Sequence, residues 1–173
     1  MKRKKKRPTF WLWVAGGIVV AFALWNLLWF LLFFRPYTQL IQEDYTKTTW
    51  NSSFVVRHSA DDSEEWFTCS VKAPDYLSTT GNLSIVSRYG THDLLIWLNP
   101  ISGNIRYGVS VGLNTTVTEG DAVPSNPTGY SFYIDEDLVP EEDSYLPIVE
   151  EYRTDIEELF AVAEAEWGIG ATG

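Results

Sequence analysis

The chain has 173 residues, of which 45% are hydrophobic, and a formal net charge of -10. Six of its 13 basic residues lie in residues 2–7, whereas all 23 acidic residues follow Pro36. The acidic part is repelled by anionic surfaces, which argues against nucleic acid as a partner and favours a divalent cation, a basic protein face or plain solvation. Cys69 is the only cysteine, so a disulfide within the chain is excluded.

The segment from Phe10 to Phe34 has no charged residue and is predicted to cross a membrane as a helix. Its 25 residues would span about 37 Å, more than the roughly 30 Å hydrocarbon core of a bilayer. The basic tail, residues 1–9, precedes this segment, and no small-residue cleavage site follows it. We therefore expect an uncleaved type II signal anchor in the cell membrane, with a cytoplasmic N-terminus.

Two faces of this helix could pack on another membrane helix. Asn26, its only strongly polar side chain, marks one face, and the small-xxx-small pair of Gly17 and Ala21 marks the opposite face. Alternatively, small residues are simply common in membrane helices, and Asn26 lies close enough to the membrane–water interface to be tolerated. Gly17, Ala21 and Asn26 are therefore candidate partner-binding residues.

After the helix we expect a juxtamembrane segment, residues 35–49, and an extracytoplasmic domain, residues 50–173. Pro36 is expected to kink or end the helix, and apolar residues in 37–45 have the spacing of a short second helix. Three Asn-x-Ser/Thr sites keep a glycosylated, eukaryotic interpretation open beside the preferred bacterial exterior. They begin at Asn51, Asn82 and Asn114.

Apolar and polar residues alternate through most of the domain, which predicts half-buried strands. The alternating segments are 54–56, 67–71, 83–85, 105–113 and 130–134. Leu94 to Leu98 is apolar on both faces and is expected to be a central strand, joined by a tight turn at 99–103 to the next one. Gly108 and Gly112 are expected to make room for Trp97 or for a helix. Cys69 falls on the apolar side and is interpreted as a buried structural thiol.

Apolar residues recur every three or four positions from about Tyr145 to Trp167, which predicts an amphipathic helix on the sheet, ended by Gly168. Its outer face is strongly acidic, and the helix dipole disfavours carboxylates near the end of the helix. A basic partner or a cation would relieve this cost, with screening by solvent and salt as the alternative. The candidate partner-binding residues on this face are Glu157, Glu158, Glu164 and Glu166.

Motifs for catalysis and for cofactor or metal binding are weak. Residues 108–112 match the nucleophile pattern G-x-S-x-G around Ser110, but the alternation continues through it and both histidines precede it. The acidic clusters at 61–65 and 135–143 lack the spacing of a calcium loop and would form a weak site at most. We expect no catalytic residue, no cofactor and no metal ligand.

These patterns predict an α+β fold with one transmembrane helix, then an antiparallel sheet of about five or six strands in meander order, packed by the C-terminal amphipathic helix. The expected function is non-enzymatic: protein binding by the acidic extracytoplasmic domain, as an accessory subunit of a membrane or cell-envelope assembly. The alternative is a sensor or small-ligand-binding domain that uses the sheet and the 114–129 loop. A surface hydrolase, with His58 or His92 beside Cys69 or a serine, ranks last.

Overall fold

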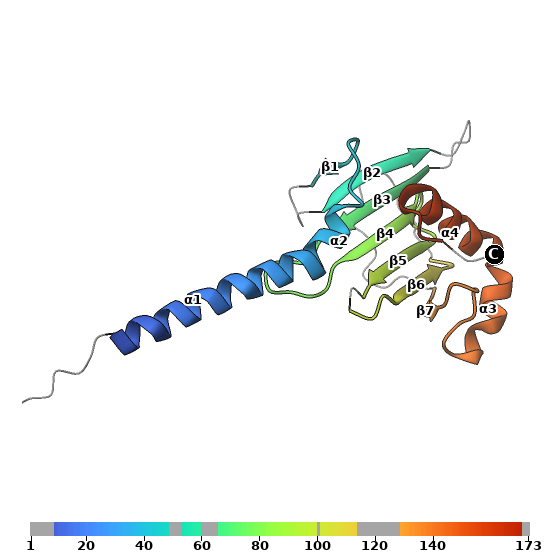
Figure 1. Ribbon diagram of the computed structural model, residues 1–173. Coiled ribbons are helices and arrows are strands. Elements are labelled where there is room, and N and C mark those ends of the chain that lie inside the picture. Colours follow the sequence, from blue (N-terminus) through green and yellow to red (C-terminus); the bar gives the residue numbers. More distant parts are fainter. Residues whose placement is uncertain (1–8, 49–52, 60–65, 100, 114–128, 171–173) are drawn as a thin grey trace, which may run out of the picture.

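The computed structural model describes residues 9–48, 53–59, 66–99, 101–113 and 129–170. A long N-terminal helix projects from a domain in which C-terminal helices cover one face of a sheet (Figure 1). The predicted α+β class and antiparallel meander are confirmed, with a sheet of seven strands rather than five or six.

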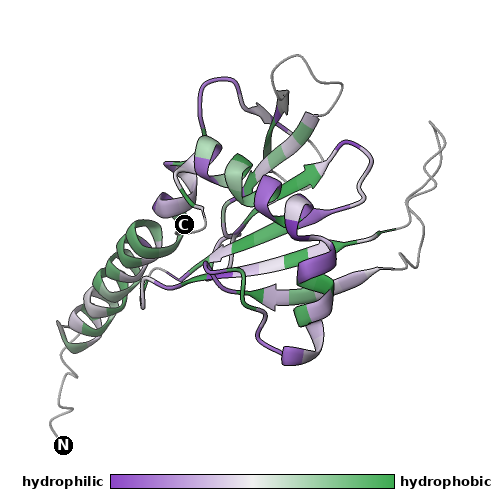
Figure 2. Ribbon diagram, turned by 90° about the vertical axis from the view of Figure 1, so that its right-hand side faces the viewer, coloured by the Kyte–Doolittle hydropathy of each residue, from purple (hydrophilic) through white to green (hydrophobic). Residues whose placement is uncertain are grey.

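The N-terminal helix is continuous over three segments: α1, Thr9–Trp29, a π-helical segment, Phe30–Phe34, and α2, Arg35–Thr38. Figure 2 shows that its residues are hydrophobic along most of its length. Its stretch Phe10–Thr38 is the one helix in the described part of the chain that is long and apolar enough to cross a membrane. The helix passes through Pro36 and ends two residues later, at Thr38, and the segment directly before the proline and Arg35 is π-helical.

Seven strands form the sheet, in the same order in space as in the chain, and all neighbours are antiparallel. They are β1, Thr46–Lys47; β2, Phe54–Ser59; β3, Trp66–Lys72; β4, Asn82–Ser87; β5, Asp93–Leu98; β6, Ile105–Val111; and β7, Tyr130–Ile134. The six predicted strands correspond to β2–β7.

The strand that was not predicted, β1, follows a segment for which the expectation of a short helix is wrong. Only the end of α2 falls within residues 37–45, and turns lead from it to β1. The chain leaves the helical path because Tyr45 is buried and held by the C-terminal helix: its hydroxyl donates to Glu166 Oε1 at 2.7 Å and accepts from Trp167 Nε1 at 2.8 Å.

The predicted C-terminal helix is present as two pieces, α3, Leu146–Glu151, and α4, Arg153–Trp167, after a 3₁₀ turn, Asp143–Tyr145. The break lies at Tyr152, whose φ and ψ of -106° and 19° are not helical. Gly168 ends α4 in the left-handed conformation, with its N–H bonded to Glu164 O, as predicted.

The core lies between the sheet and these helices. Alternate side chains of β3–β7 are fully or nearly fully buried there, Cys69 among them, against Ile156, Leu159 and Phe160 of α4. The intervening side chains face the other side of the sheet, where residues such as Leu95 and Trp97 are only half-buried. We call this second side, which none of the described helices covers, the open face (Figures 1 and 2).

Candidate functional site

Three large side chains gather on the open face. Trp97 of β5 and Tyr133 of β7 meet above the intervening strand β6, with ring centroids 5.9 Å apart. Arg106 of β6 lies over Tyr133, with its guanidinium carbon 3.5 Å from the ring centroid. We call Trp97, Arg106 and Tyr133 the aromatic cluster. Its members belong to the residue types that most often dominate the binding energy of protein interfaces.

Glycine at position 108 allows Trp97 to lie close over β6. A Cβ atom on Gly108 would be 2.9 Å from Cζ3 of the Trp97 ring, closer than real side chains approach. Directly after this strand, Gly112 has a positive φ of 65°, and its Cβ would lie 2.8 Å from the hydroxyl of Tyr152 at the α3–α4 break. The prediction that these glycines make room for Trp97 and for a helix is therefore confirmed.

Glu141 holds Arg106 over the tyrosine ring. The Nε and Nη2 atoms of Arg106 donate to Oε1 and Oε2 of Glu141 at 3.3 and 3.1 Å. Glu141 reaches this position because its own N–H donates to the carbonyl of Tyr133 at 3.0 Å. An exposed ion pair contributes at most about 1 kcal/mol. The main effect of this one is to orient the guanidinium group before anything binds.

Two pockets flank the aromatic cluster, and Trp97 lines both. The first has a volume of about 400 Å³ and is also lined by Ser110, Tyr133, Glu142 and Tyr145. The second, of about 590 Å³, extends toward the N-terminal helix, where its walls include Phe33, Ile101 and Ile105. The first pocket has the size of sites that accept a small molecule or an anchoring side chain.

A partly buried carboxylate lies on the same face, at the start of β5. Asp93 is opposite Ser110 in the register of β5 and β6, and the hydroxyl of Ser110 bonds to it. Burial raises the pKa of Asp93, an effect that the Ser110 hydroxyl and nearby His92 partly oppose. Asp93 Oδ1 has no hydrogen-bond partner among the described residues. Ser110 is thus part of a polar row, in which it also accepts a hydrogen bond from Ser131 at 3.1 Å.

The hydrolase alternative gains no support from the groups on which it depends. The ring of His92 pairs through Nδ1 with Thr91 Oγ1 at 3.1 Å, and the side chain of His58 lies outside the described residues. Cys69 is fully buried, and burial raises the pKa of its thiol to about 12. A thiol in this state is a structural one, as the sequence indicates.

The acidic segment 135–143 uses its first carboxylate to form a turn. Asp135 Oδ1 accepts hydrogen bonds from the N–H groups of Asp137 and Val139, at 3.0 and 2.8 Å. Within the described ranges, no group of three or more His, Cys, Asp or Glu side chains is arranged to hold a metal ion. The other acidic cluster, residues 61–65, lies outside those ranges.

The junction between the N-terminal helix and the sheet is built around Tyr37. This side chain is 1% exposed, and its hydroxyl donates to Gly81 O at 3.0 Å and accepts from Leu98 N–H at 3.1 Å. Gly81 has to be glycine, because a Cβ atom there would lie 2.5 Å from Lys72 O and 3.0 Å from the Tyr37 ring. The end of the helix is thereby fixed to both β4 and β5.

Asn26, a candidate partner-binding residue, already has partners within the chain. Its Oδ1 accepts a hydrogen bond from the hydroxyl of Tyr76 at 2.7 Å, and its Nδ2 donates to Phe22 O at 2.7 Å. One turn further along, Trp29 Nε1 donates to Ser78 O at 2.6 Å, and the Trp29 and Tyr76 rings pack edge to face at 5.5 Å. The chain between β3 and β4 therefore runs back along the helix.

The other candidates on the N-terminal helix remain accessible. Gly17 and Ala21 are exposed, and nothing lies within 4 Å of the position of a Cβ atom on Gly17. The small-residue face that the sequence indicates is therefore available for a second helix.

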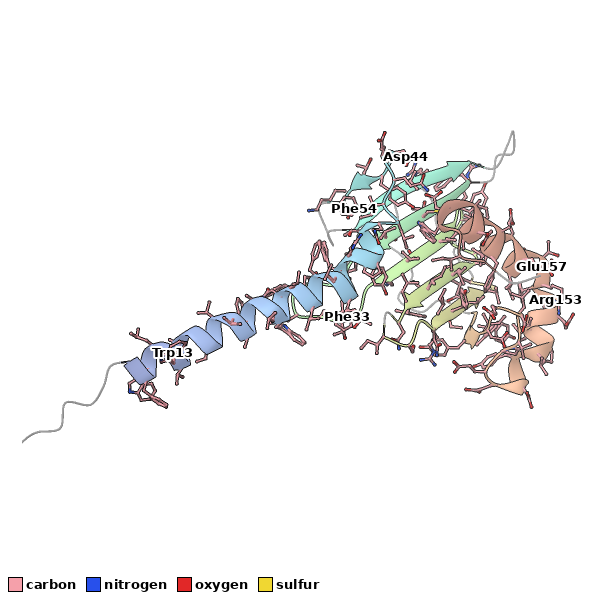
Figure 3. The ribbon with its side chains drawn as sticks, viewed as in Figure 1. Trp13, Phe33, Asp44, Phe54, Arg153 and Glu157 are labelled. Carbon is pink, nitrogen blue, oxygen red and sulfur yellow. The ribbon has the colours of Figure 1, made fainter. Side chains whose placement is uncertain are left out.

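The four candidate glutamates of α4 differ in how exposed their side chains are. Glu157 points away from the sheet beside Arg153, with which it pairs at 3.7 Å (Figure 3), and Glu164 is also exposed. Glu158 is half-buried. Glu166 is not on the outer face as expected: it is half-buried, because its carboxylate accepts the Tyr45 hydroxyl. Glu157 and Glu164 are the pair left fully exposed.

Sequence reasoning placed Trp97 near Gly108 but missed Arg106 and Tyr133. A signal for both was present. Arg106 is two residues before Gly108, and Tyr133 alternates with Phe132 and Ile134, so that each belongs to the strand face opposite the core. No comparable sequence pattern indicated the contacts of Tyr37 and Tyr76.

No protein-family model matches the chain, and searches among curated proteins and among solved structures find no significant match. The function is therefore inferred from the surfaces described above.

Proposed function

We propose that this protein is a single-pass membrane protein of type II topology whose extracytoplasmic domain binds a protein partner through the aromatic cluster. The basic tail before the helix and the acidic chain after it support this orientation. The observation that carries the binding proposal is the aromatic cluster of Trp97, Arg106 and Tyr133 on the open face, next to a pocket of about 400 Å³.

The cluster has the properties of a binding surface whose side chains are already in place. Gly108 lets the indole lie close over β6, and Glu141 holds the guanidinium, so little side-chain freedom is lost when a partner binds. The pocket provides space for one apolar anchor side chain, and Glu142 in its wall favours a basic residue beside that anchor.

A partner in the same membrane fits the rest of the chain. The helix is fixed to the sheet by Tyr37, so the domain stays near the bilayer, and the exposed Gly17 and Ala21 offer a face to a second helix. This is the arrangement of an accessory subunit of a membrane or cell-envelope assembly.

The test is purification of the tagged full-length protein from its native membrane in mild detergent, with mass spectrometry of the bound proteins. Tyr133→Ala and Arg106→Ala are compared with Tyr130→Ala, an exposed tyrosine at the other end of β7. Loss of a hot-spot side chain costs about 2 kcal/mol, so a specific partner is expected to fall roughly thirtyfold with the cluster variants. The Tyr130→Ala control is expected to retain it.

Two results would contradict the proposal. If the wild-type protein reproducibly comes out alone, protein binding is wrong. If a partner is retained by both cluster variants but lost in Gly17→Leu or Ala21→Leu, the contact is made in the membrane and the open face is not the site.

The pocket also supports a second candidate function, the binding of a small ligand. Its volume lies within the range of ligand sites, and both aromatic side chains and polar ones, Ser110, Ser131, Glu141 and Glu142, line it. A ligand screen by thermal shift on the full-length protein tests this function. A compound that stabilises the wild type but not Tyr133→Ala would favour the sensor interpretation, and absence of any such compound would count against it.

A further inference from the structure

We propose that the loop between β3 and β4, residues 73–81, is a second membrane-contact element, lying in the head-group layer of the outer leaflet beside the anchor helix. This inference rests on the membrane anchoring proposed above and names a surface that the anchoring alone does not imply. We call residues 73–81 the membrane loop.

The depth of the loop follows from where it touches the helix. A hydrocarbon core of roughly 30 Å corresponds to about 20 helical residues, so a span that begins at Phe10 reaches the outer boundary near Trp29. The loop contacts Trp29 through Ser78 O and contacts Asn26, one turn earlier, through Tyr76. Tilting the helix moves the boundary further along it and places these contacts deeper still.

The loop presents apolar side chains at this depth. Tyr76 is 56% exposed and Leu77 is 55% exposed. Leu77 has a positive φ of 69°, a backbone conformation that leucine rarely adopts. In water these two neighbours would form an exposed apolar tip. In the interface a tyrosine and a leucine are favourable, since the ring and the aliphatic group enter the acyl boundary while the hydroxyl stays bonded.

Several polar groups of the loop are bonded within the protein, which lowers the cost of placing irregular chain near lipid. Ser78 N–H donates to Asp75 O at 2.8 Å, Ser78 O accepts from Trp29, and Gly81 O accepts from Tyr37. The exposed carboxylate of Asp75 limits how deep the membrane loop can lie in the bilayer, because an anion is tolerated among head groups but not in hydrocarbon.

A second apolar tip lies at the same end of the sheet. Ile101, in the turn between β5 and β6, is 77% exposed. It lines the larger pocket together with Phe33 of the helix and Thr80 of the membrane loop, so the turn, the helix and the loop share one surface. The end of the sheet nearest the helix therefore faces the bilayer with two apolar tips.

The experiment measures which of these sites contact lipid. Spin labels are placed by Leu77→Cys and Ile101→Cys in the full-length protein, reconstituted in vesicles of phosphatidylcholine and phosphatidylglycerol. Wild-type Cys69 can remain, because it is fully buried. Power saturation then compares collisions with oxygen, which partitions into lipid, and with a water-soluble nickel chelate.

Two matched sites calibrate the result. Leu24→Cys, 54% exposed and five residues before the end of α1, reports lipid, and Tyr89→Cys, 60% exposed at the β4–β5 turn at the opposite end of the sheet, reports water. The ratio of oxygen to nickel collisions at Leu77→Cys is expected to be roughly tenfold above that at Tyr89→Cys, with Ile101→Cys between them.

Each other outcome overturns the inference in a distinguishable way. If Leu77→Cys behaves like Tyr89→Cys while Leu24→Cys reports lipid, the helix is anchored but the loop is in water. If Leu24→Cys also reports water, the proposed anchoring itself fails. If Leu77→Cys is shielded from both reagents, a protein surface, such as a partner helix or a second copy of this chain, covers the loop instead of lipid.

Discussion

The hydroxyl of Tyr37 accepts a hydrogen bond from the backbone N–H of Leu98 at 3.1 Å, and so joins the last turn of the N-terminal helix to the end of β5. The same hydroxyl donates to Gly81 at the start of β4. One buried side chain thus connects three elements that lie up to 61 residues apart in the chain.

Replacing this hydroxyl is expected to destabilise the junction. Tyr37→Phe leaves the Leu98 N–H and the Gly81 carbonyl without their partner, at a cost of about 1–3 kcal/mol in the free energy of unfolding. Chemical denaturation in micelles measures this cost, and amide hydrogen exchange at Leu98 should accelerate. Tyr130→Phe, at an exposed tyrosine, is the control and should stay within about 0.5 kcal/mol of wild type. An unchanged stability of Tyr37→Phe would contradict the role assigned to this contact.

The close approach of Trp97 to Gly108 predicts a coupling that a double-mutant cycle can measure. Gly108→Ala forces the indole away from β6 and is expected to destabilise the protein by about 1–3 kcal/mol. In a Trp97→Ala background the added Cβ meets only the Tyr133 ring, at an ordinary contact distance of 3.7 Å, and the cost should fall below about 0.5 kcal/mol. Equal costs in the two backgrounds would show that Trp97 is not what excludes a Cβ atom at this position.

The partly buried carboxylate of Asp93 predicts a pH dependence of stability. Burial raises its pKa in the folded state, so the folded protein binds this proton more tightly than the unfolded chain does. Its contribution to stability is therefore complete below the unfolded-state pKa of about 3.9 and is lost as the pH rises through the higher folded-state value.

Asp93→Asn removes this charge and isolates its effect. The variant is expected to raise Tm by about 2 °C at pH 7, a small value because the carboxylate is only partly buried and is screened by solvent. The gain should shrink as the pH approaches 4. Thermal unfolding followed by near-UV circular dichroism at several pH values measures it, and a gain that is instead larger at low pH would contradict the direction of the shift.

Cys69 is expected to be chemically inert in the folded protein. With a pKa of about 12, about one thiol in ten thousand is ionised at pH 8, and the side chain is fully buried. Labelling by a maleimide should be undetectable over hours in native buffer and complete within minutes in denaturant. Mass spectrometry distinguishes these results. Rapid native labelling would place Cys69 at an accessible, reactive position, contrary to the structure.

Local patterns predicted the parts of the fold that depend on local chemistry. Alternation identified five of the six longer strands, a continuous apolar run identified β5, Gly168 identified the end of α4, and the absence of a side chain at Gly108 identified the place of Trp97. The strand and helix-end signals lie within a few residues of the features that they predict, and the hairpin of β5 and β6 brings Gly108 next to Trp97.

The features that sequence reasoning missed depend on contacts between distant residues. Tyr45 ends a turn instead of a helix because its hydroxyl meets Glu166, 121 residues later, and this contact also turns Glu166 inward. Asn26 bonds to Tyr76, 50 residues away. A two-residue strand such as β1 is too short for any periodicity, so only its pairing with β2 reveals it.

The contacts of Asn26, Trp29 and Tyr37 join the end of the N-terminal helix to the domain, so the orientation of the domain would follow that of the helix. Since Tyr37 holds the last turn of the helix in the core, a change in the tilt of the helix would rotate the sheet. In the proposed anchoring, the long apolar segment would tilt more in a thin bilayer and stand more upright in a thick one. Changes in membrane thickness would therefore rotate the open face, and any protein bound there, by the same angle as the helix.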